Sequence, residues 1–158
     1  MSEISFEDRT VIVTGAGNGL GKAYAIELGN RGAKVVVNDL GGAVDGSGSG
    51  STPADEVVNE IISNGGEAVA NYDSVATKDG GESIVQSAID NFGTVDAVIN
   101  NAGILRDKSF AKLSEEELSL VIDVHLKGTF FVSQPAFKVM KEKNCLLYTS
   151  PSPRDKRQ

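Results

Sequence analysis

Short apolar runs alternate along this chain with longer segments in which apolar residues recur at helical spacing. The short runs are rich in valine and isoleucine and have the length of buried parallel strands: residues 11–15, 34–39, 68–72 and 95–100. Segments with a helical apolar pattern follow each run, over residues 22–28, 57–62, 84–92 and beyond Ser114. The alternation predicts an α/β fold, a doubly wound parallel sheet in a three-layer α/β/α arrangement with strand order 3-2-1-4.

Residues that begin or end helices stand at the borders of these segments. Thr52, which precedes a proline, and Ser114, which pairs with Glu117 in a capping box, are expected to begin two helices. Pro135 is expected to kink or break the last helix, because it removes a backbone donor and crowds the preceding turn. The glycine- and serine-rich residues 41–50 predict a flexible loop. Three helices are expected to end at glycines: Gly32, Gly65–Gly66 and Gly93.

A glycine-rich turn joins the first predicted strand to the first helix. The stretch TGAGNGLG at 14–21 has the spacing G-x-x-x-G-x-G and does not fit the usual G-x-G-x-x-G pattern. A strand, a glycine-rich turn and a helix together place a pyrophosphate at the helix N-terminus. A P-loop is excluded, because Ala16 and Ala23 stand where that motif needs a glycine and a hydroxyl residue. The turn predicts a Rossmann-type dinucleotide site, with an ordinary glycine-rich turn as the alternative, at these residues: Gly15, Asn18, Gly19 and Gly21.

A carboxylate ends the second predicted strand, at the edge where open α/β sheets bind their ligands. Asp39 lies 24 residues after Gly15, near the spacing of about 20 expected for the acidic residue that accepts ribose hydroxyls. Such a carboxylate repels a 2′-phosphate, and no Lys or Arg lies in 38–50 to bind one. Asp39 therefore predicts NAD rather than NADP as the cofactor, with a simple turn-forming role before Gly41 as the alternative.

The third predicted strand is also followed by polar residues, Asp73 and Ser74, and by Val75. A carboxylate at this place can accept a hydrogen bond from the adenine amine. A plain Asx turn explains the same residues equally well.

Small and amide side chains follow the fourth predicted strand. The amides of Asn100 and Asn101 can bridge neighbouring strand ends, while Ala102 and Gly103 let the backbone approach a ribose. Residues 101–103 are therefore candidate cofactor ligands, although taken singly they read as a loop. The one histidine, His125, falls on the last predicted helix and is interpreted as a surface or structural residue.

Composition and charge exclude several classes of protein. The 158 residues carry a formal net charge of −7, with twenty acidic and nine basic residues in 1–136, which disfavours contact with nucleic-acid phosphates. No apolar run approaches the roughly 18 residues needed to cross a bilayer, and the acidic N-terminus does not resemble a signal peptide. Cys145 is the single cysteine, so an internal disulfide is impossible. These features favour a cytoplasmic protein that binds a small molecule and neither nucleic acid nor a membrane.

Taken together, the signals at the strand ends resemble the short-chain dehydrogenase/reductase family over residues 6–143. The runs 36–42, 70–75 and 101–107 resemble the branch of (3R)-hydroxyacyl-CoA dehydrogenase units found in multifunctional enzymes, with their bacterial relatives. The resemblance implies hydride transfer between NAD and a secondary alcohol, a 3-hydroxyacyl-CoA of fatty-acid β-oxidation, with a steroid or other alcohol as the alternative. It also implies a homo-oligomer for the full-length form and a peroxisomal location if the source is eukaryotic.

The resemblance implies roles for individual residues. Leu20 would lie beside the nicotinamide, Asp39 beside the adenine ribose, residues 73–75 beside the adenine, and Asn101 beside the inner ribose. His125 stands where the family often has an asparagine.

The proton-transfer pair of the family, a tyrosine with a lysine four residues later, has no match in this sequence. Tyr24, Tyr72 and Tyr148 are followed four residues later by Leu28, Ala76 and Ser152. We therefore predict no catalytic residue and no metal ligand. A non-catalytic NAD-binding module is the alternative to an enzyme.

The resemblance ends near Asn144. Residues 144–158 resemble translated sequencing-adapter DNA, which leads to the hypothesis of a truncated gene with an artificial C-terminus. The expected organisation is an NAD-binding Rossmann domain at 1–143, an incomplete short-chain dehydrogenase, followed by a non-family tail at 144–158 that is artefactual or disordered.

Overall fold

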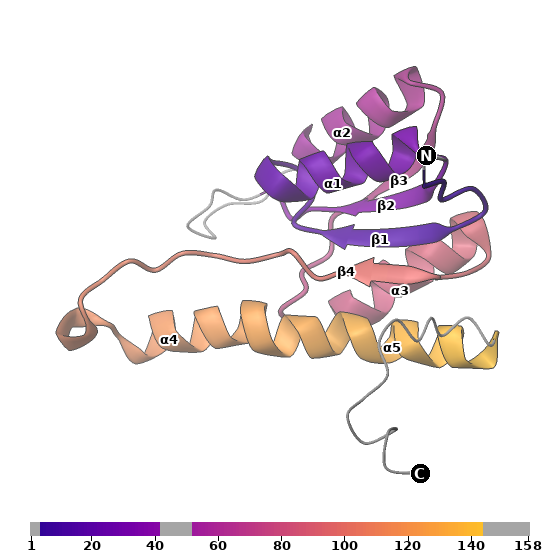
Figure 1. The fold of residues 1–158 in the computed structure, drawn as a ribbon. Coiled ribbons are helices and arrows are strands. Elements are labelled where there is room, and N and C mark those ends of the chain that lie inside the picture. Colours follow the sequence, from indigo (N-terminus) through magenta and orange to yellow (C-terminus); the bar gives the residue numbers. More distant parts are fainter. Residues whose placement is uncertain (1–3, 42–51, 144–158) are drawn as a thin grey trace, which may run out of the picture.

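A four-stranded parallel sheet forms the centre of the chain in the computed structural model, which describes residues 4–41 and 52–143 (Figure 1). The strands lie in the order β3-β2-β1-β4. Their bounds are β1 Thr10–Thr14, β2 Lys34–Asn38, β3 Glu67–Asn71 and β4 Ala97–Ile99. The predicted α/β class and strand order are confirmed. Residues 42–50 of the loop predicted at 41–50, and the tail at 144–158, lie outside the described residues.

Helices cover both faces of the sheet. Helices α1 (Gly19–Asn30) and α2 (Thr52–Ser63) lie on one face, and α3 (Lys78–Phe92) and α5 (Gly128–Glu142) lie on the other (Figure 1). Alternate residues of each strand point to opposite faces, so the chain has two cores. In β1, Val11 and Val13 belong to the core beneath α1 and α2, while Ile12 belongs to the core beneath α3 and α5.

The fourth strand is shorter than the sequence pattern suggested. Residues 95–100 were expected to be extended, but β4 covers only Ala97–Ile99. The reason lies in Asp96, whose side-chain Oδ2 accepts a hydrogen bond from Thr10 N at 2.8 Å. A side chain therefore satisfies the first amide of β1, and the strand pairing of β4 with β1 begins one residue later, at Val11 and Ala97.

Pro135 was expected to kink or break the last helix, and the break is wrong. Helix α4 (Glu115–Ile122), a π-helical turn η2 (Asp123–Lys127) and α5 follow one another without interruption, and Pro135 lies inside α5. The proline leaves the carbonyl of Phe131 without its usual helical donor. That carbonyl faces the backbone of α3 at Gly81, where a Cβ would lie 2.9 Å from the Phe131 Cβ. Because Gly81 has no side chain, α3 and α5 approach closely enough to cover the freed oxygen.

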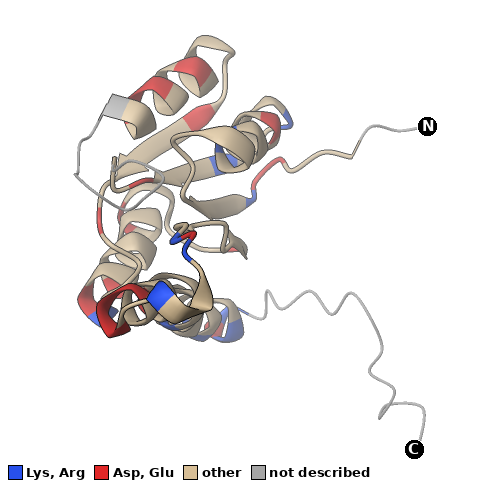
Figure 2. Cartoon of the chain, turned by 90° about the vertical axis from the view of Figure 1, so that its left-hand side faces the viewer, with Lys and Arg blue, Asp and Glu red and all other residues tan. Residues whose placement is uncertain are grey.

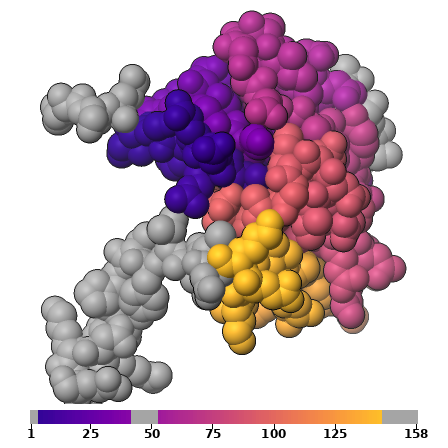
Figure 3. All heavy atoms as spheres, turned by 90° about the vertical axis from the view of Figure 1, so that its right-hand side faces the viewer, coloured from indigo at the N-terminus to yellow at the C-terminus, as the bar shows by residue number. Residues whose placement is uncertain are grey.

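Most of the predicted helix ends are confirmed. Gly93 is the left-handed C-cap of α3, and Gly32 and Gly65, both with positive φ, follow the last residues of α1 and α2. Ser114 and Glu117 form the expected capping box at the start of α4. Figure 3 shows the end of α5 against the segment that follows α3, where Lys143 Nζ donates to the carbonyl oxygen of Gly93. The three glycines thus lie in loops that lead to the amino ends of the following strands, whereas Ser114 ends the long loop after the carboxyl end of β4.

Candidate functional site

A cleft of about 360 Å³ opens at the carboxyl ends of the strands. Residues from the loops after all four strands line it, together with Val124 of the η2 turn. Ten of the twelve residues predicted to bind a cofactor lie together in this lining: Gly15, Asn18, Gly19, Asp39, Asp73, Ser74, Val75, Asn101, Ala102 and Gly103. The lining also holds residues that the sequence analysis did not name: Asn38, Leu40, Ile104 and Val124.

The two remaining predicted residues lie beside the cleft and not in its lining. Leu20 is 68% exposed on the first turn of α1. Gly21 is buried, and a Cβ on it would lie 2.5 Å from the amide nitrogen of Asn101 and closer still to the Gly15 oxygen. Gly21 therefore lets α1 pack against the turn, and its contribution to a ligand site is indirect.

The glycines that line the cleft leave room for a ligand next to the backbone. Gly15 and Gly19 have φ angles of +62° and +54°, in the left-handed region that favours glycine. A Cβ on Gly15 would lie 2.8 Å from the Cα of Ala102, whereas a Cβ on Gly19 would meet no atom within 4 Å. The turn is therefore closed on the side of β4 and open above α1.

The N-terminus of α1 lacks the groups that usually satisfy the start of a helix. Its N-cap, Asn18, makes no side-chain capping bond, and the first turn holds no acidic residue. Helices α3 and α4 differ, because Thr77 and Ser114 cap them and acidic residues occupy their first turns. The backbone N–H groups and the positive end of the helix dipole at α1 are thus available to an anion from the cleft.

Asp39 is held in place by two backbone amides. Its Oδ2 accepts a hydrogen bond from Gly17 N and its Oδ1 accepts one from Gly41 N, each at 2.8 Å. Gly17 was missing from the predicted site, although a Cβ on it would lie 2.8 Å from the Asp39 carboxyl carbon. The second glycine of the GAG run was the signal that could have indicated such a close approach. Asp39 therefore carries its charge at a defined position beside the glycine-rich turn.

Asn101 and Thr14 join the ends of β1 and β4. The Asn101 side-chain amide donates to the carbonyl oxygens of Thr14 and Gly15 at 3.0 and 2.9 Å. In return, Thr14 Oγ1 accepts from the backbone N–H groups of Asn101 and Ala102, each at 3.1 Å. The predicted bridging role is confirmed for Asn101, whereas Asn100 bonds Ser133 Oγ on α5. The wall of the cleft between β1 and β4 is thus fixed by side chains.

His125 lies on the η2 turn and is exposed, with Nε2 within 3.0 Å of the backbone nitrogen of Ile104 and 2.9 Å of its oxygen. A Cβ on Gly103 would lie 2.7 Å from the histidine ring. The ring therefore packs against the loop after β4 and borders the mouth of the cleft.

Three of the described residues have shifted pKa values: Tyr72 after β3, and Glu116 and Glu117 at the start of α4. The Tyr72 hydroxyl donates to Asp55 Oδ1 at 2.5 Å, and this bond together with partial burial raises the pKa of Tyr72. The contact ties the end of β3 to α2 beside the cleft. At the start of α4, hydrogen bonds from Lys108 and from the Ser114 backbone lower the pKa of Glu117.

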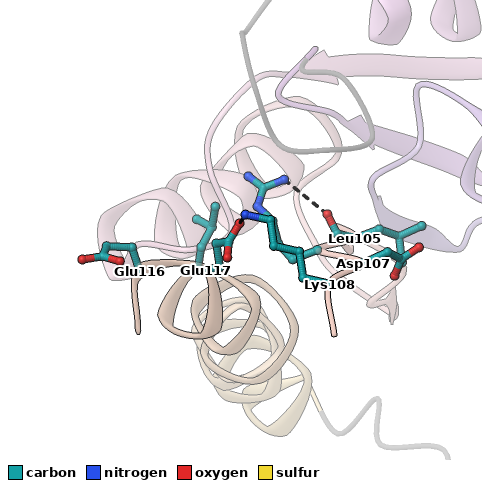
Figure 4. A pocket seen from close by; sticks show the side chains of 7 residues that line it. Leu105, Asp107, Lys108, Glu116 and Glu117 are labelled. Carbon is teal, nitrogen blue, oxygen red and sulfur yellow. Dashed lines mark hydrogen bonds and ion pairs between the residues drawn. The ribbon is translucent and has the colours of Figure 1, made fainter. Parts of the chain in front are cut away.

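A second, open hollow of about 520 Å³ lies between the loop after β4 and α4 (Figure 4). Two of its charged groups form an ion pair, with Lys108 Nζ 2.5 Å from Glu117 Oε1, and Arg106 donates to the Leu105 carbonyl oxygen. None of the residues predicted to bind a cofactor lines it. We therefore assign the candidate site to the cleft at the strand ends.

The charges around the cleft are mixed. Figure 2 looks onto the carboxyl-end edge and shows acidic and basic residues interspersed, without a continuous basic stripe among the residues described. No group of three or more His, Cys, Asp or Glu side chains within 4–41 and 52–143 is placed to hold a metal ion. In the same part of the chain, every helix is too short or too polar to cross a membrane.

A parallel sheet with a glycine-rich turn, an uncapped helix and a carboxylate at the end of the second strand defines a nucleotide-binding α/β protein. Its sequence matches the short chain dehydrogenase family over residues 9–145, and the chain belongs to that family. Members of the family are oxidoreductases that generally bind NAD(P). The family prediction is thereby confirmed.

The relatives also agree with the predicted branch. Peroxisomal multifunctional enzyme A of Dictyostelium discoideum is 58% identical over 89% of this chain, and peroxisomal multifunctional enzyme type 2 of Mus musculus is 53% identical over 90%. The crystal structure of a short chain dehydrogenase from Mycobacterium avium superimposes with a TM-score of 0.79 and 44% identity over 87% of the chain. The chain spans 31% and 19% of the two multifunctional enzymes and 49% of the solved chain.

Proposed function

We propose that the cleft binds NAD, with the adenine ribose at Asp39. The observation that carries this proposal is the carboxylate of Asp39, which lines the cleft and is fixed by Gly17 N and Gly41 N. A carboxylate is an acceptor only, so each oxygen has a further lone pair for a ribose hydroxyl, while its charge repels a 2′-phosphate.

The rest of the lining fits a dinucleotide. The pyrophosphate lies above Gly19, where the turn is open and the uncapped N-terminus of α1 offers backbone N–H groups. The adenine lies against residues 73–75 and the inner ribose against 101–103, on the two sides of the cleft. Leu20, exposed on the first turn of α1, lies beside the nicotinamide.

We infer that the full-length protein oxidises a secondary alcohol of the 3-hydroxyacyl-CoA class. NAD, when bound, supplies the hydride acceptor for this reaction. The resemblance of the sequence to (3R)-hydroxyacyl-CoA dehydrogenase units supports this substrate class over a steroid or another alcohol, and a relative from Synechocystis sp. that is 40% identical over 86% of this chain is named a 3-oxoacyl-[acyl-carrier-protein] reductase. In the same proposal, residues 1–143 form the cofactor-binding domain, residues 144–158 form a tail outside it, and the full-length form is a homo-oligomer. A peroxisomal location applies to a eukaryotic source and a cytoplasmic one otherwise.

The 158-residue chain is expected to bind NAD without oxidising an alcohol. None of its three tyrosines is followed by lysine four residues later, so the group that would take the alcohol proton is missing. Calorimetric titration with NAD and an assay of NADH formation with a 3-hydroxyacyl-CoA distinguish the two activities. Binding with turnover would contradict this reading, and an absence of NAD binding would contradict the proposed function.

The Asp39→Asn variant tests the preference for NAD over NADP. The parent chain is expected to bind NAD about 100-fold more tightly, because a fixed carboxylate opposes a 2′-phosphate. Loss of the charge is expected to reduce this ratio by about tenfold or more, with NAD binding itself weakened because an amide cannot accept from both Gly17 N and Gly41 N. The measurement is calorimetric titration with each dinucleotide.

Asp90→Asn is the matched control, because Asp90 is exposed on α3 and lies outside the cleft lining. It removes the same charge and is expected to leave the ratio of affinities unchanged. A parent chain that binds NADP as tightly as NAD would contradict the assignment of Asp39.

A further inference from the structure

The carboxylate of Asp73 has two unequal oxygens. Its Oδ2 accepts a hydrogen bond from Asn71 Nδ2 at 2.9 Å and one from Ser83 Oγ at 2.7 Å. Its Oδ1 has no hydrogen-bond partner among the residues that the structure describes. Asp73 is half-buried and lines the cleft. One oxygen is therefore anchored to the protein, and the other is left to a donor from outside.

The anchor on the β3 side is itself rigid. Asn71 is only 7% exposed, and its Oδ1 accepts from Asn38 Nδ2 at 2.8 Å and from Asp73 N at 3.0 Å. Asn38 is 2% exposed and also donates to the Asp73 carbonyl oxygen at 2.9 Å. A flipped Asn71 amide would set its oxygen against a carboxylate and its N–H groups against two donors. The network thus permits a single orientation, in which Asn71 Nδ2 points at Asp73.

The second anchor comes from a different element. Ser83 lies in α3, is exposed, and reaches Asp73 from the solvent side. Among the residues that the structure describes, its hydroxyl makes one hydrogen bond, to Asp73, and the core residues of α3 are its neighbours Ile84 and Val85. Without the Ser83 hydroxyl, only the Asn71 amide would restrain the carboxylate, which could then turn about its Cβ–Cγ bond.

We propose that Asn71 and Ser83 are positioning residues that orient Asp73 so that the cleft selects a purine bearing an exocyclic amino group. The proposal rests on the proposed function, because it concerns the base of the dinucleotide bound in the cleft. The free Oδ1 accepts from the amino group of adenine. Hypoxanthine presents a carbonyl oxygen at the same place, so two acceptors would face each other without a proton between them.

The experiment compares NAD with nicotinamide hypoxanthine dinucleotide, in which a carbonyl replaces this amino group and the neighbouring N1 carries a hydrogen. Calorimetric titrations are made with the parent chain and with Ser83→Ala. The parent is expected to prefer NAD by about tenfold, the effect of one hydrogen bond to a charged acceptor at a partly exposed site. In Ser83→Ala the preference is expected to fall to about threefold or less, through weaker binding of NAD.

Two further variants separate positioning from a general effect on α3. Ser83→Thr retains the hydroxyl and is expected to keep the parent preference. Ser87→Ala makes the same change one turn later on α3, away from the cleft lining, and is also expected to keep it. Because Ser83 is exposed, its replacement by alanine is not expected to unfold the chain.

The possible results have distinct meanings. A parent preference that Ser83→Ala reduces and Ser83→Thr retains supports the proposal. If the parent binds NAD but Ser83→Ala leaves the preference unchanged, or weakens both ligands equally, the positioning role is overturned while the NAD site stands. A parent chain that binds neither dinucleotide overturns both proposals.

Discussion

The Gly21→Ala variant is expected to lose about 3–5 kcal/mol of its free energy of unfolding, a large part of the roughly 5–15 kcal/mol typical of a domain. The new Cβ would lie 2.5 Å from Asn101 Nδ2 and closer still to the Gly15 oxygen. The Gly15 oxygen is a backbone atom, so contact is relieved only by moving α1 away from β1. The same Cβ would also press on the Asn101 side-chain nitrogen, which donates to the carbonyl oxygens of Thr14 and Gly15. Urea denaturation followed by circular dichroism measures the loss.

Gly19→Ala, two residues earlier in the same turn, is the matched control. Its Cβ would meet no atom of the described residues within 4 Å, so among these only the φ of +54° opposes the substitution, at a cost of about 1–2 kcal/mol. Gly19→Ala should be the more stable of the two variants but the weaker in NAD binding, because the Gly19 Cβ enters the space assigned to the pyrophosphate. Gly19→Ala is therefore expected to fold and to bind NAD poorly. Equal stability of the Gly21→Ala variant and the parent would contradict the close packing described above.

Much of the fold could be predicted from residues that lie close together in the sequence. Helix ends at Gly32 and Gly93 and the capping box at Ser114 depend on residues within one turn of each other, so they can be read from neighbouring positions. The same holds for the G-x-x-x-G-x-G turn, because strand, turn and helix are contiguous. The strand order followed from the alternation of elements and the right-handed crossover rule.

The features that could not be predicted depend on residues distant in the sequence. Pro135 remains inside a helix because Gly81, more than fifty residues earlier, admits the carbonyl that the proline frees. The short β4 reflects the bond of Asp96 to Thr10. The first is a close approach of two helices and the second a hydrogen bond between a side chain and a distant backbone amide, and no local pattern indicates either.

In the candidate site, too, some residues could be predicted from local patterns, and others depend on contacts between residues distant in the sequence. The strand-end position alone predicted Asp39, Asp73 and Asn101 in one cleft, because the carboxyl ends of parallel strands share an edge. The residues that hold them, Gly17 and Asn38 among others, were missed. A buried asparagine at the end of a valine-rich strand has no distinctive spacing, and its role emerges only when β2 and β3 are placed in register.

Replacement of Thr14 by valine is expected to cost about 1–3 kcal/mol of unfolding free energy and to weaken NAD binding. Valine has nearly the same shape but no oxygen, so the backbone N–H of Ala102 loses the acceptor that lies 3.1 Å from it, while that of Asn101 retains only the Ile99 carbonyl oxygen at 3.0 Å. Thr14 is 1% exposed, and water therefore cannot replace the hydroxyl without opening the site. Both amides belong to the cleft wall, so the same substitution is expected to displace residues 101–103 from their ligand-facing position.

Thr14→Ser separates the hydroxyl from the methyl group. Serine retains the acceptor for both amides and loses only one buried methyl, at a cost of about 1 kcal/mol. We therefore expect Thr14→Ser to bind NAD nearly as the parent does, whereas Thr14→Val binds it weakly and unfolds at lower urea concentration. Valine and serine variants of equal stability and affinity would show that the hydroxyl does not hold the two strand ends together. The bond network between β1 and β4, and with it the inner-ribose side of the proposed NAD site, would then need a different explanation.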